Sequence, residues 1–199
     1  MTKAEFAARL KRACASVLAA EDELTEIDSR FGDADHGLTM AKIARAISTA
    51  VDQAEGGIQA MLDDAAMAVM TLNGGSAVPL WNTWLDGMQE EAPEGNEIDV
   101  PGLQAIFARA LETLDDMSGA KVGDKTMMDA LIPASRAIIS FQGSDEAALF
   151  AAAAQAAAQG AEDSKRFVSK FGRAKSYGEK TIGTPDAGAV SMSYFFQGL

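Results

Sequence analysis

The stretch Asp28-Ser29-Arg30-Phe31-Gly32-Asp33-Ala34-Asp35-His36-Gly37 gathers three carboxylates and the one histidine of the chain. Two glycines lie beside these charged side chains and allow a tight turn. Carboxylates this close repel one another unless they are protonated or bridged by cations. Hard cations such as Mg²⁺ prefer such oxygen ligands. The stretch therefore predicts a magnesium and nucleotide site, with the rest of the chain as its scaffold.

The composition is that of one acidic globular domain. The chain has 199 residues, of which 48% are hydrophobic, enough for one core of ordinary size and a single domain, residues 1–199. Its 17 basic and 29 acidic residues give a formal net charge of −12. This charge argues against nucleic acid or an anionic membrane as a partner. An acidic protein that handles phosphate must recruit cations locally.

The cysteine content and the N-terminal sequence predict the compartment. The single cysteine, Cys14, excludes an internal disulfide and suits a reducing environment. The first 12 residues mix both signs of charge and lack the apolar segment of a secretory signal. No stretch reaches the roughly 18 uninterrupted apolar residues that a membrane span requires. We therefore expect a soluble, cytoplasmic protein.

Apolar residues recur at helical spacing through most of the chain, and period-2 alternation is almost absent. A long amphipathic helix is predicted from Thr2 to about Ile27, and a second from Thr39 to the Gly56-Gly57 pair. Further helices are predicted over about 58–70, 80–88, 101–114, 127–140 and 144–170, followed by a short final helix around 192–196. The predicted fold is all-α, an antiparallel bundle of about eight helices.

Four glycine-bearing loops, residues 32–39, 73–79, 119–126 and 172–188, connect the predicted helices. In antiparallel neighbours, alternate loops lie at the same end of a bundle. Glycine allows a backbone to approach a ligand closely, and helix N-termini present free N–H groups to phosphate. The loops therefore predict a nucleotide site at one end of the bundle.

Other kinds of site fit the sequence poorly. An EF-hand that begins at Asp33 needs glycine at its sixth position and glutamate at its twelfth, but the chain has Leu38 and Ala44 there. One histidine and one cysteine, far apart, do not make a zinc site. Glycosidases hold two carboxyls apart across a sugar, rather than three in one turn. The segment from Gly119 to Thr126 lacks the glycine and lysine spacing of a P-loop.

Several short motifs occur in an order that resembles one family. They are Leu24-Thr25-Glu26-Ile27-Asp28, Gly32 to Gly37, Met70-Thr71-Leu72 with Gly74-Gly75 and Pro79-Leu80, Gly123-Asp124-Lys125-Thr126-Met127, Gly172-Arg173-Ala174, Gly178-Glu179, and Ile182-Gly183 with Asp186-Ala187-Gly188-Ala189. Along essentially the whole chain the sequence resembles the nucleotide-binding L subunit of dihydroxyacetone kinases. The resemblance implies an eight-helix antiparallel barrel that binds ADP or ATP with two Mg²⁺ at one end.

The resemblance also implies roles for individual residues. Asp28, Asp33 and Asp35 match the metal ligands and the catalytic carboxylates. For His36 we expect a hydrogen-bonding role at the site, with a phosphohistidine relay as the alternative. The residues that match nucleotide contacts are His36, Gly37, Leu38, Thr39, Ser76, Ala77, Gly119, Met127, Arg173, Asp186, Ala187 and Gly188.

The implied activity is phosphoryl transfer to a short ketose. In the family the ketose, such as dihydroxyacetone, is held by a histidine of a separate K subunit, so the L chain itself lacks the acceptor site. Two donor modes exist: Mg-ATP exchanges at each turnover, or bound ADP is rephosphorylated in place by a phosphotransferase-system protein. The expected partners are therefore the K subunit and such a donor protein. The sequence leaves open whether the chain forms a homodimer.

The chain departs from the family pattern at three places. Its second loop reads Gly74-Gly75-Ser76-Ala77-Val78-Pro79 where Gly-Gly-Ala-Ser-Gly-Pro is usual. Ile43 replaces a common glycine, and Ala187 replaces the usual proline between Asp186 and Gly188. The altered loop favours the phosphotransferase-system mode. Two other functions fit the same resemblance: a nucleotide-sensing module that contacts a transcription regulator, and a fatty-acid kinase nucleotide domain with a separate acyl-binding partner.

Overall fold

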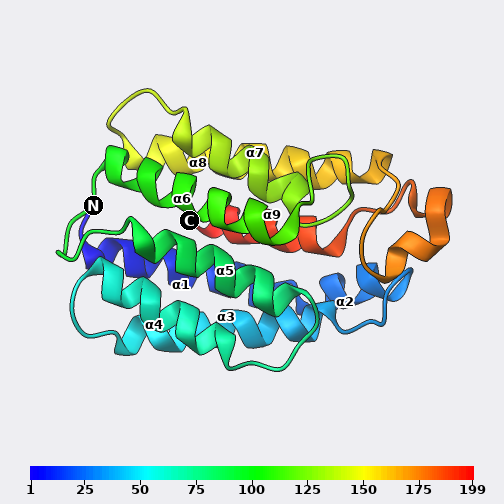
Figure 1. Ribbon diagram of the computed structural model, residues 1–199, viewed down its shortest axis with the longest axis horizontal. Coiled ribbons are helices and arrows are strands. Elements are labelled where there is room, and N and C mark those ends of the chain that lie inside the picture. The colour runs from blue at the N-terminus through cyan, green and yellow to red at the C-terminus, as the bar shows by residue number, and fades with distance from the viewer.

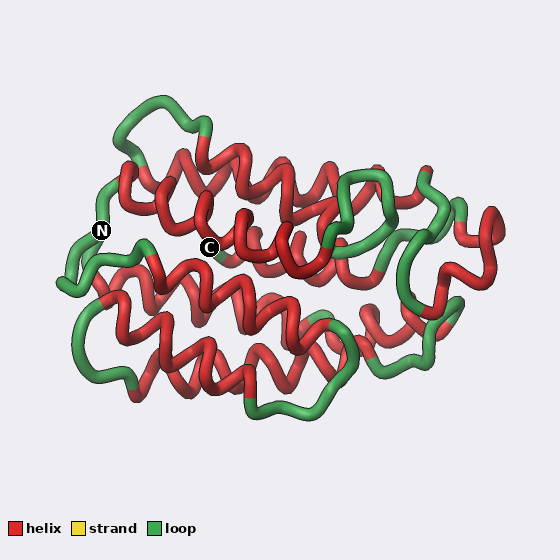
Figure 2. The backbone as a smooth tube through the Cα atoms, in the orientation of Figure 1, coloured by secondary structure: helices red, strands yellow, loops and turns green.

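Nine α-helices and two 3₁₀ segments make up the computed structural model, which describes residues 1–199 and contains no β-strand (Figure 2). The prediction of an all-α fold is confirmed. The helices are α1 (Lys3–Ala19), α2 (Glu21–Ser29), α3 (His36–Gln53), α4 (Ile58–Met70), α5 (Ala77–Glu90), α6 (Val100–Ser118), α7 (Met128–Ile139), α8 (Glu146–Asp163) and α9 (Ala187–Gly198), with 3₁₀ segments η1 (Ser164–Arg166) and η2 (Arg173–Thr181) before α9.

Side-chain caps explain where several helices begin. Thr2 and Glu5 form a reciprocal capping box at the start of α1. The Asp99 side chain accepts the Gly102 N–H at the start of α6, and the Asp145 side chain accepts two backbone N–H groups at the start of α8. These caps satisfy donors that have no partner within their own helix.

The long helices form a closed ring. Going around it, α1 packs on α3, α3 on α4, α4 on α5, α5 on α6, α6 on α7, α7 on α8 and α8 on α9. The ring closes because α9 also packs on α1. Successive helices run in opposite directions along the long axis of the molecule (Figure 1). The structure is therefore the antiparallel helical barrel that the resemblance implies, with α2 as an extension of one end.

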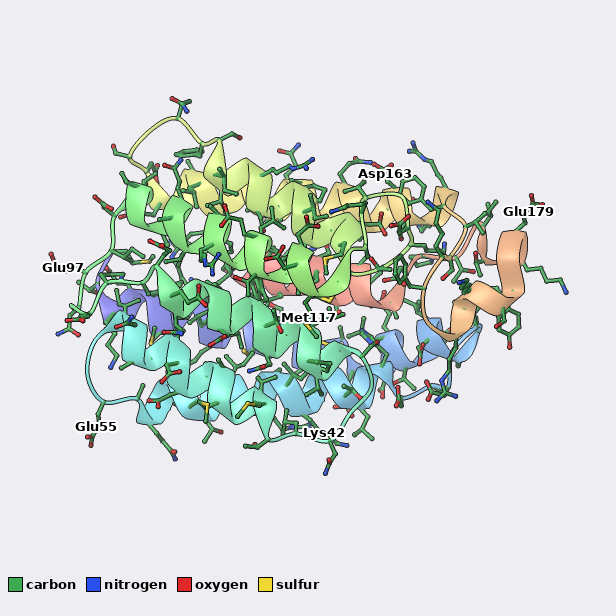
Figure 3. The ribbon with its side chains drawn as sticks, viewed as in Figure 1. Lys42, Glu55, Glu97, Met117, Asp163 and Glu179 are labelled. Carbon is green, nitrogen blue, oxygen red and sulfur yellow. The ribbon has the colours of Figure 1, made fainter.

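This topology places four connections at the same end of the barrel. The segments after α2, α4, α6 and α8 all lie toward the right of Figure 1, beside η2. The connections after α3, α5 and α7 lie at the opposite end, where Glu55 and Glu97 are labelled in Figure 3. The four glycine-bearing loops predicted to share one end therefore do so.

A cluster of aromatic side chains lies within the apolar core of the barrel. The Trp84 ring centre lies 5.5 Å from that of Trp81, 5.6 Å from Phe195 and 6.0 Å from Phe107, and these four side chains are buried. Edge-on contacts of this kind add to the free energy gained from burying the rings. The core therefore fixes α5, α6 and α9 relative to one another and leaves little interior space there.

Four details differ from the predicted elements. The predicted helix from Thr2 to Ile27 is two helices, interrupted at Ala20. Three acidic residues, 21–23, follow this break, and acidic side chains favour the first turn of a helix over its interior. Helix α3 begins at His36 rather than Thr39, and α5 begins at Ala77, before Leu80. Helix α8 ends at Asp163, and the glycine-rich segment after it contains η2.

None of the helices is both long enough and apolar enough to cross a membrane.

The closest helix contact generates a testable prediction. A Cβ atom added at Gly160 of α8 would lie 1.9 Å from the carbonyl oxygen of Asp129 in α7. We expect Gly160→Ala to force these helices apart and to lower the free energy of unfolding by about 2–3 kcal/mol. Urea denaturation measures this change. Gly95→Ala is the matched control, because nothing lies within 4 Å of its added Cβ. Equal stability of the two variants would contradict the close approach.

Candidate functional site

A cavity of about 780 Å³ opens at the end of the barrel where the four loops meet. Its wall takes residues from each loop, among them Asp33, Ser76, Thr126 and Arg173. Met117, at the end of α6, lies on the cavity wall and is labelled in Figure 3. A second hollow of about 740 Å³ lies on the surface between α3 and α4, with no carboxylate cluster, so the site is assigned to the first.

Three carboxylates converge on the wall of this cavity. Asp28, Asp33 and Asp35 each offer an oxygen, and these oxygens all lie within 4.8 Å of one another. Burial, and then the charges of Asp33 and Asp28, raise the pKa of Asp35. The donor set is all oxygen, anionic and partly exposed, which fits a hard divalent cation such as Mg²⁺. Cations at this position would relieve the repulsion that the three charges otherwise sustain.

The turn that carries these carboxylates is shaped by Asp28. One carboxylate oxygen of Asp28 accepts the backbone N–H of Asp35 at 3.1 Å and that of His36 at 3.4 Å. Glycine fits at position 32, because an added Cβ would lie 2.0 Å from the other carboxylate oxygen of Asp28 and 2.9 Å from its carbonyl oxygen, so that Asp28 would have to shift. Ala34 takes a left-handed backbone with φ of 60°. The last residues of α2 and the first of α3 are thus joined through one side chain.

Segment η2 lies across the acidic turn. The Arg173 guanidinium lies 2.7 Å from an Asp33 carboxylate oxygen. The Tyr177 ring stacks edge-on against Phe31, with ring centres 5.2 Å apart. Arg173 is the cation that meets the cluster directly, and a guanidinium also suits the oxygens of a phosphate. Segment η2 therefore brings a positive charge to the wall that carries the three carboxylates.

His36 is held by hydrogen bonds inside the site. Its Nε2 lies 3.2 Å from the Ser191 hydroxyl oxygen, and that hydroxyl donates to the Gly188 carbonyl oxygen at 2.8 Å. Because the hydroxyl proton is committed to Gly188, the Ser191 oxygen accepts from His36 Nε2–H. Burial lowers the pKa of His36, although the Asp28 charge opposes this. The imidazole is therefore neutral near pH 7 and links α3 to α9.

Most of the residues matched to nucleotide contacts lie on the cavity wall. Three do not. Gly37 is buried where α3 meets α2, and an added Cβ would lie 2.1 Å from the Glu21 carbonyl oxygen. The Leu38 side chain is 48% exposed and is not part of the wall. Gly119 ends α6 with φ of 63° and is also not part of the wall. The other nine residues line the same cavity as the three aspartates. They are His36, Thr39, Ser76, Ala77, Met127, Arg173, Asp186, Ala187 and Gly188.

The altered second loop keeps a hydroxyl on the wall. Ser76 is exposed, lines the cavity and makes no capping hydrogen bond to α5. Val78, which stands where glycine is usual, is buried in the first turn of α5. An added Cβ at Gly74 would lie 2.6 Å from Val78 and 3.0 Å from Thr39. The valine therefore packs beneath the loop, and the serine is left free for a ligand.

Sequence reasoning gave no role to two buried ionisable residues, one in the motif from Gly123 to Met127 and one just after it. Lys125 is 4% exposed and donates to the carbonyl oxygens of Ser164 and Thr184. Asp129 is fully buried and accepts the backbone N–H groups of Gly123 and Thr126, both at 2.6 Å. Burial lowers the pKa of Lys125 and raises that of Asp129. The available signal was a lysine next to Thr126 in a glycine-bearing loop, with an aspartate three residues after Thr126 in a mostly apolar helix.

The fold and the site together define a helical-barrel protein with a cavity of about 780 Å³ and a cluster of three carboxylates at one end. The chain belongs to the DAK2 domain family, whose profile matches residues 30–199.

Relatives of known name support this assignment. The chain is 36% identical to an L-erythrulose kinase of Pectobacterium atrosepticum, over 94% of this chain and 32% of that protein. It is 28% identical to the ADP-binding subunit DhaL of the PEP-dependent dihydroxyacetone kinase of Escherichia coli, over 94% of this chain and 90% of that subunit. It thus spans about a third of the length of the erythrulose kinases it matches.

A solved structure shows the same fold. The dihydroxyacetone kinase of C. freundii, in complex with AMP-PNP and Mg²⁺, superposes with a TM-score of 0.73. The sequences are 24% identical, and the match covers 98% of this chain and 33% of that one. The likeness extends over the whole helical barrel.

The electrostatics of the site generate a pH prediction. Burial raises the pKa of Asp186 to about 7, above the value of about 3.9 in an unfolded chain. Because the pKa of Asp186 is higher in the folded state than in the unfolded state, protonation of Asp186 stabilises the fold. This stabilisation is complete below pH ~4 and is lost as the pH rises toward 7. Asp186→Asn removes the titration, so between pH 5 and pH 8 the wild type should lose about 2 kcal/mol more than the variant.

Urea denaturation of the metal-free protein at the two pH values measures this difference. Asp63→Asn, at an exposed position in α4, is the control and should follow the wild type. An Asp186→Asn profile parallel to the wild type would show that Asp186 is ionised throughout.

Proposed function

We propose that this chain is the nucleotide-binding subunit of a ketose kinase and presents a Mg-nucleotide to an acceptor held on a partner protein. The observation that carries the proposal is the convergence of Asp28, Asp33 and Asp35 on a cavity built from four loops and several helix N-termini. Metal ions supply charge neutralisation and alignment of the phosphates in phosphoryl transfer. The carboxylates would hold two Mg²⁺, and the nucleotide would be ADP or ATP.

Other residues of the cavity wall would bind the phosphates and orient the site. The Ser76 hydroxyl and the backbone N–H groups in the first turns of α5 and α9 offer donors to phosphate oxygens. Arg173 exchanges its contact with Asp33 for one with a phosphate when cations take over the cluster. The hydrogen bond between His36 Nε2 and Ser191 orients the start of α3, so this nitrogen is engaged in the fold rather than free to carry a phosphoryl group. The chain thus positions the donor, which is most of the catalysis in phosphoryl transfer.

The acceptor would be a short ketose bound to a separate K-type subunit. The relatives named above act on erythrulose or dihydroxyacetone, which are ketoses of four and three carbons. The single histidine of this chain is hydrogen-bonded inside the nucleotide site, so it is not free to hold a ketone. We therefore place the ketose-binding histidine on the partner.

The ligand assignment is tested by changing one aspartate. Asp33→Asn removes one charge from the cluster and should weaken Mg-dependent ADP binding by at least about tenfold. Isothermal titration calorimetry with and without Mg²⁺ measures the affinity, and circular dichroism should show unchanged helix content. Asp63→Asn, an exposed aspartate of α4 away from the cavity, is the matched control. Unchanged Mg-dependent affinity in Asp33→Asn would refute the role of the cluster.

The donor is tested on the purified protein. In the in-place mode the protein copurifies with stoichiometric ADP, and ketose phosphorylation with a K-type partner requires a phosphotransferase-system donor protein. We expect this mode, because a relative that matches 94% of this chain, over 90% of its own length, is named as PEP-dependent. Turnover with free ATP as the sole donor would instead establish the exchange mode. Absence of turnover with any K-type partner, while Mg-ADP still binds, would favour a nucleotide-sensing role.

A further inference from the structure

Lys125 is an unusual residue in the wall of the cavity. It is buried and yet charged, and it forms no ion pair with any carboxylate. Its backbone φ of 58° lies in the left-handed region, which lysine rarely adopts. Backbone strain of this kind persists where the surrounding structure enforces it, and it is concentrated at functional sites. The fold therefore holds a lysine where glycine would be easier to accommodate.

The Lys125 ammonium joins two segments that are distant in sequence. It donates to the Ser164 carbonyl oxygen at 2.7 Å and to the Thr184 carbonyl oxygen at 2.5 Å. Ser164 is the C-cap of α8, where the helix dipole favours a cation, and its carbonyl oxygen also accepts the Phe167 N–H at 3.2 Å. Thr184 lies two residues before the N-cap of α9. One ammonium therefore links the end of one helix to the segment that leads into the next.

Two weaker hydrogen bonds support the same junction. The Gly183 N–H donates to the Lys165 carbonyl oxygen at 2.7 Å, and the Asp186 N–H donates to the Ser164 hydroxyl at 2.9 Å. Both are neutral, whereas hydrogen bonds from an ammonium are about twice as strong. Lys125 is thus the charged member of the junction between α8 and α9.

The junction sets the position of a wall of the cavity. Ala187 and Gly188 form the first turn of α9 and line the cavity, as does Lys125 itself. An ammonium has three N–H donors. The two carbonyl groups therefore use two of the three donors.

We propose that Lys125 is a positioning residue for the nucleotide: its ammonium clamps the end of α8 to the segment before α9 and so holds the first turn of α9 against the bound phosphates. This inference rests on the proposed function, because the ligand it positions is the Mg-nucleotide. It assigns a role to the motif from Gly123 to Met127 that the metal cluster and the helix N-termini leave unexplained.

Two variants separate the ammonium from the backbone strain. Lys125→Met removes the ammonium but keeps a side chain in the left-handed conformation. Lys125→Gly removes the ammonium and relieves the strain, so it should melt at a higher temperature than Lys125→Met. Both should bind Mg-ADP at least about tenfold more weakly than the wild type. Lys121→Met is the matched control, because Lys121 lies in the same loop, pairs with Asp115 on the surface and should bind as the wild type does.

Hydrogen exchange provides a readout in the ligand-free protein. The backbone N–H groups of Gly183 and Asp186 should exchange faster in both Lys125 variants, while those of α4 at the far side of the barrel keep the wild-type rates.

The outcomes distinguish this inference from the proposed function. Affinity of both variants within about twofold of the wild type would overturn the positioning role alone. Weak binding by Lys125→Met with normal binding by Lys125→Gly would also overturn it, because the defect would then come from strain rather than from the ammonium. Failure of the wild type to bind Mg-ADP would overturn the proposed function and this inference with it.

Discussion

Like-charge repulsion among Asp28, Asp33 and Asp35 is the constraint around which one end of the barrel is built. The oxygens of these residues lie within 4.8 Å of one another, and such a cluster is unfavourable unless positive charge offsets it. The chain supplies part of that charge through Arg173, which contacts Asp33, and through the backbone N–H groups of residues 35 and 36, which bond to Asp28. The remaining charge is available to cations, so the features that hold the turn together also define what it binds.

Different interactions stabilise the apolar barrel and the polar site. The aromatic cluster around Trp84 fixes the helices, whereas no comparable cluster fixes the loops at the cavity. Buried ionisable groups hold these loops. Asp129 of α7 accepts two backbone N–H groups of the loop before its helix, and Lys125 donates to two carbonyl groups of the connection between α8 and α9. Buried charges are costly unless their hydrogen bonds are complete, and here they organise backbone that no secondary structure would hold.

The sequence predicts this architecture better than its details, for physical reasons. Apolar periodicity marks helices because burial dominates stability, and the glycine loops mark one end because antiparallel helices alternate in direction. The break at Ala20 escaped prediction because the apolar stripe continues through it, while the acidic residues after it favour a new helix start. The contacts of Lys125 escaped prediction because they join it to segments remote in sequence. The aspartate cluster was predictable because its members are neighbours in the chain.

The departures from the family pattern fall into two groups once their positions are known. Ile43 and Val78 replace glycines, but both side chains are buried, so they change the packing beneath the site rather than its lining. Ser76 and Ala187 lie on the cavity wall and change the donors that it offers. Alanine at position 187 has a backbone N–H that the usual proline lacks, and this N–H belongs to the first turn of α9, where helical partners are absent. The wall therefore gains one donor at the helix terminus that Lys125 holds in place, while the hydroxyl of the second loop is moved by one residue.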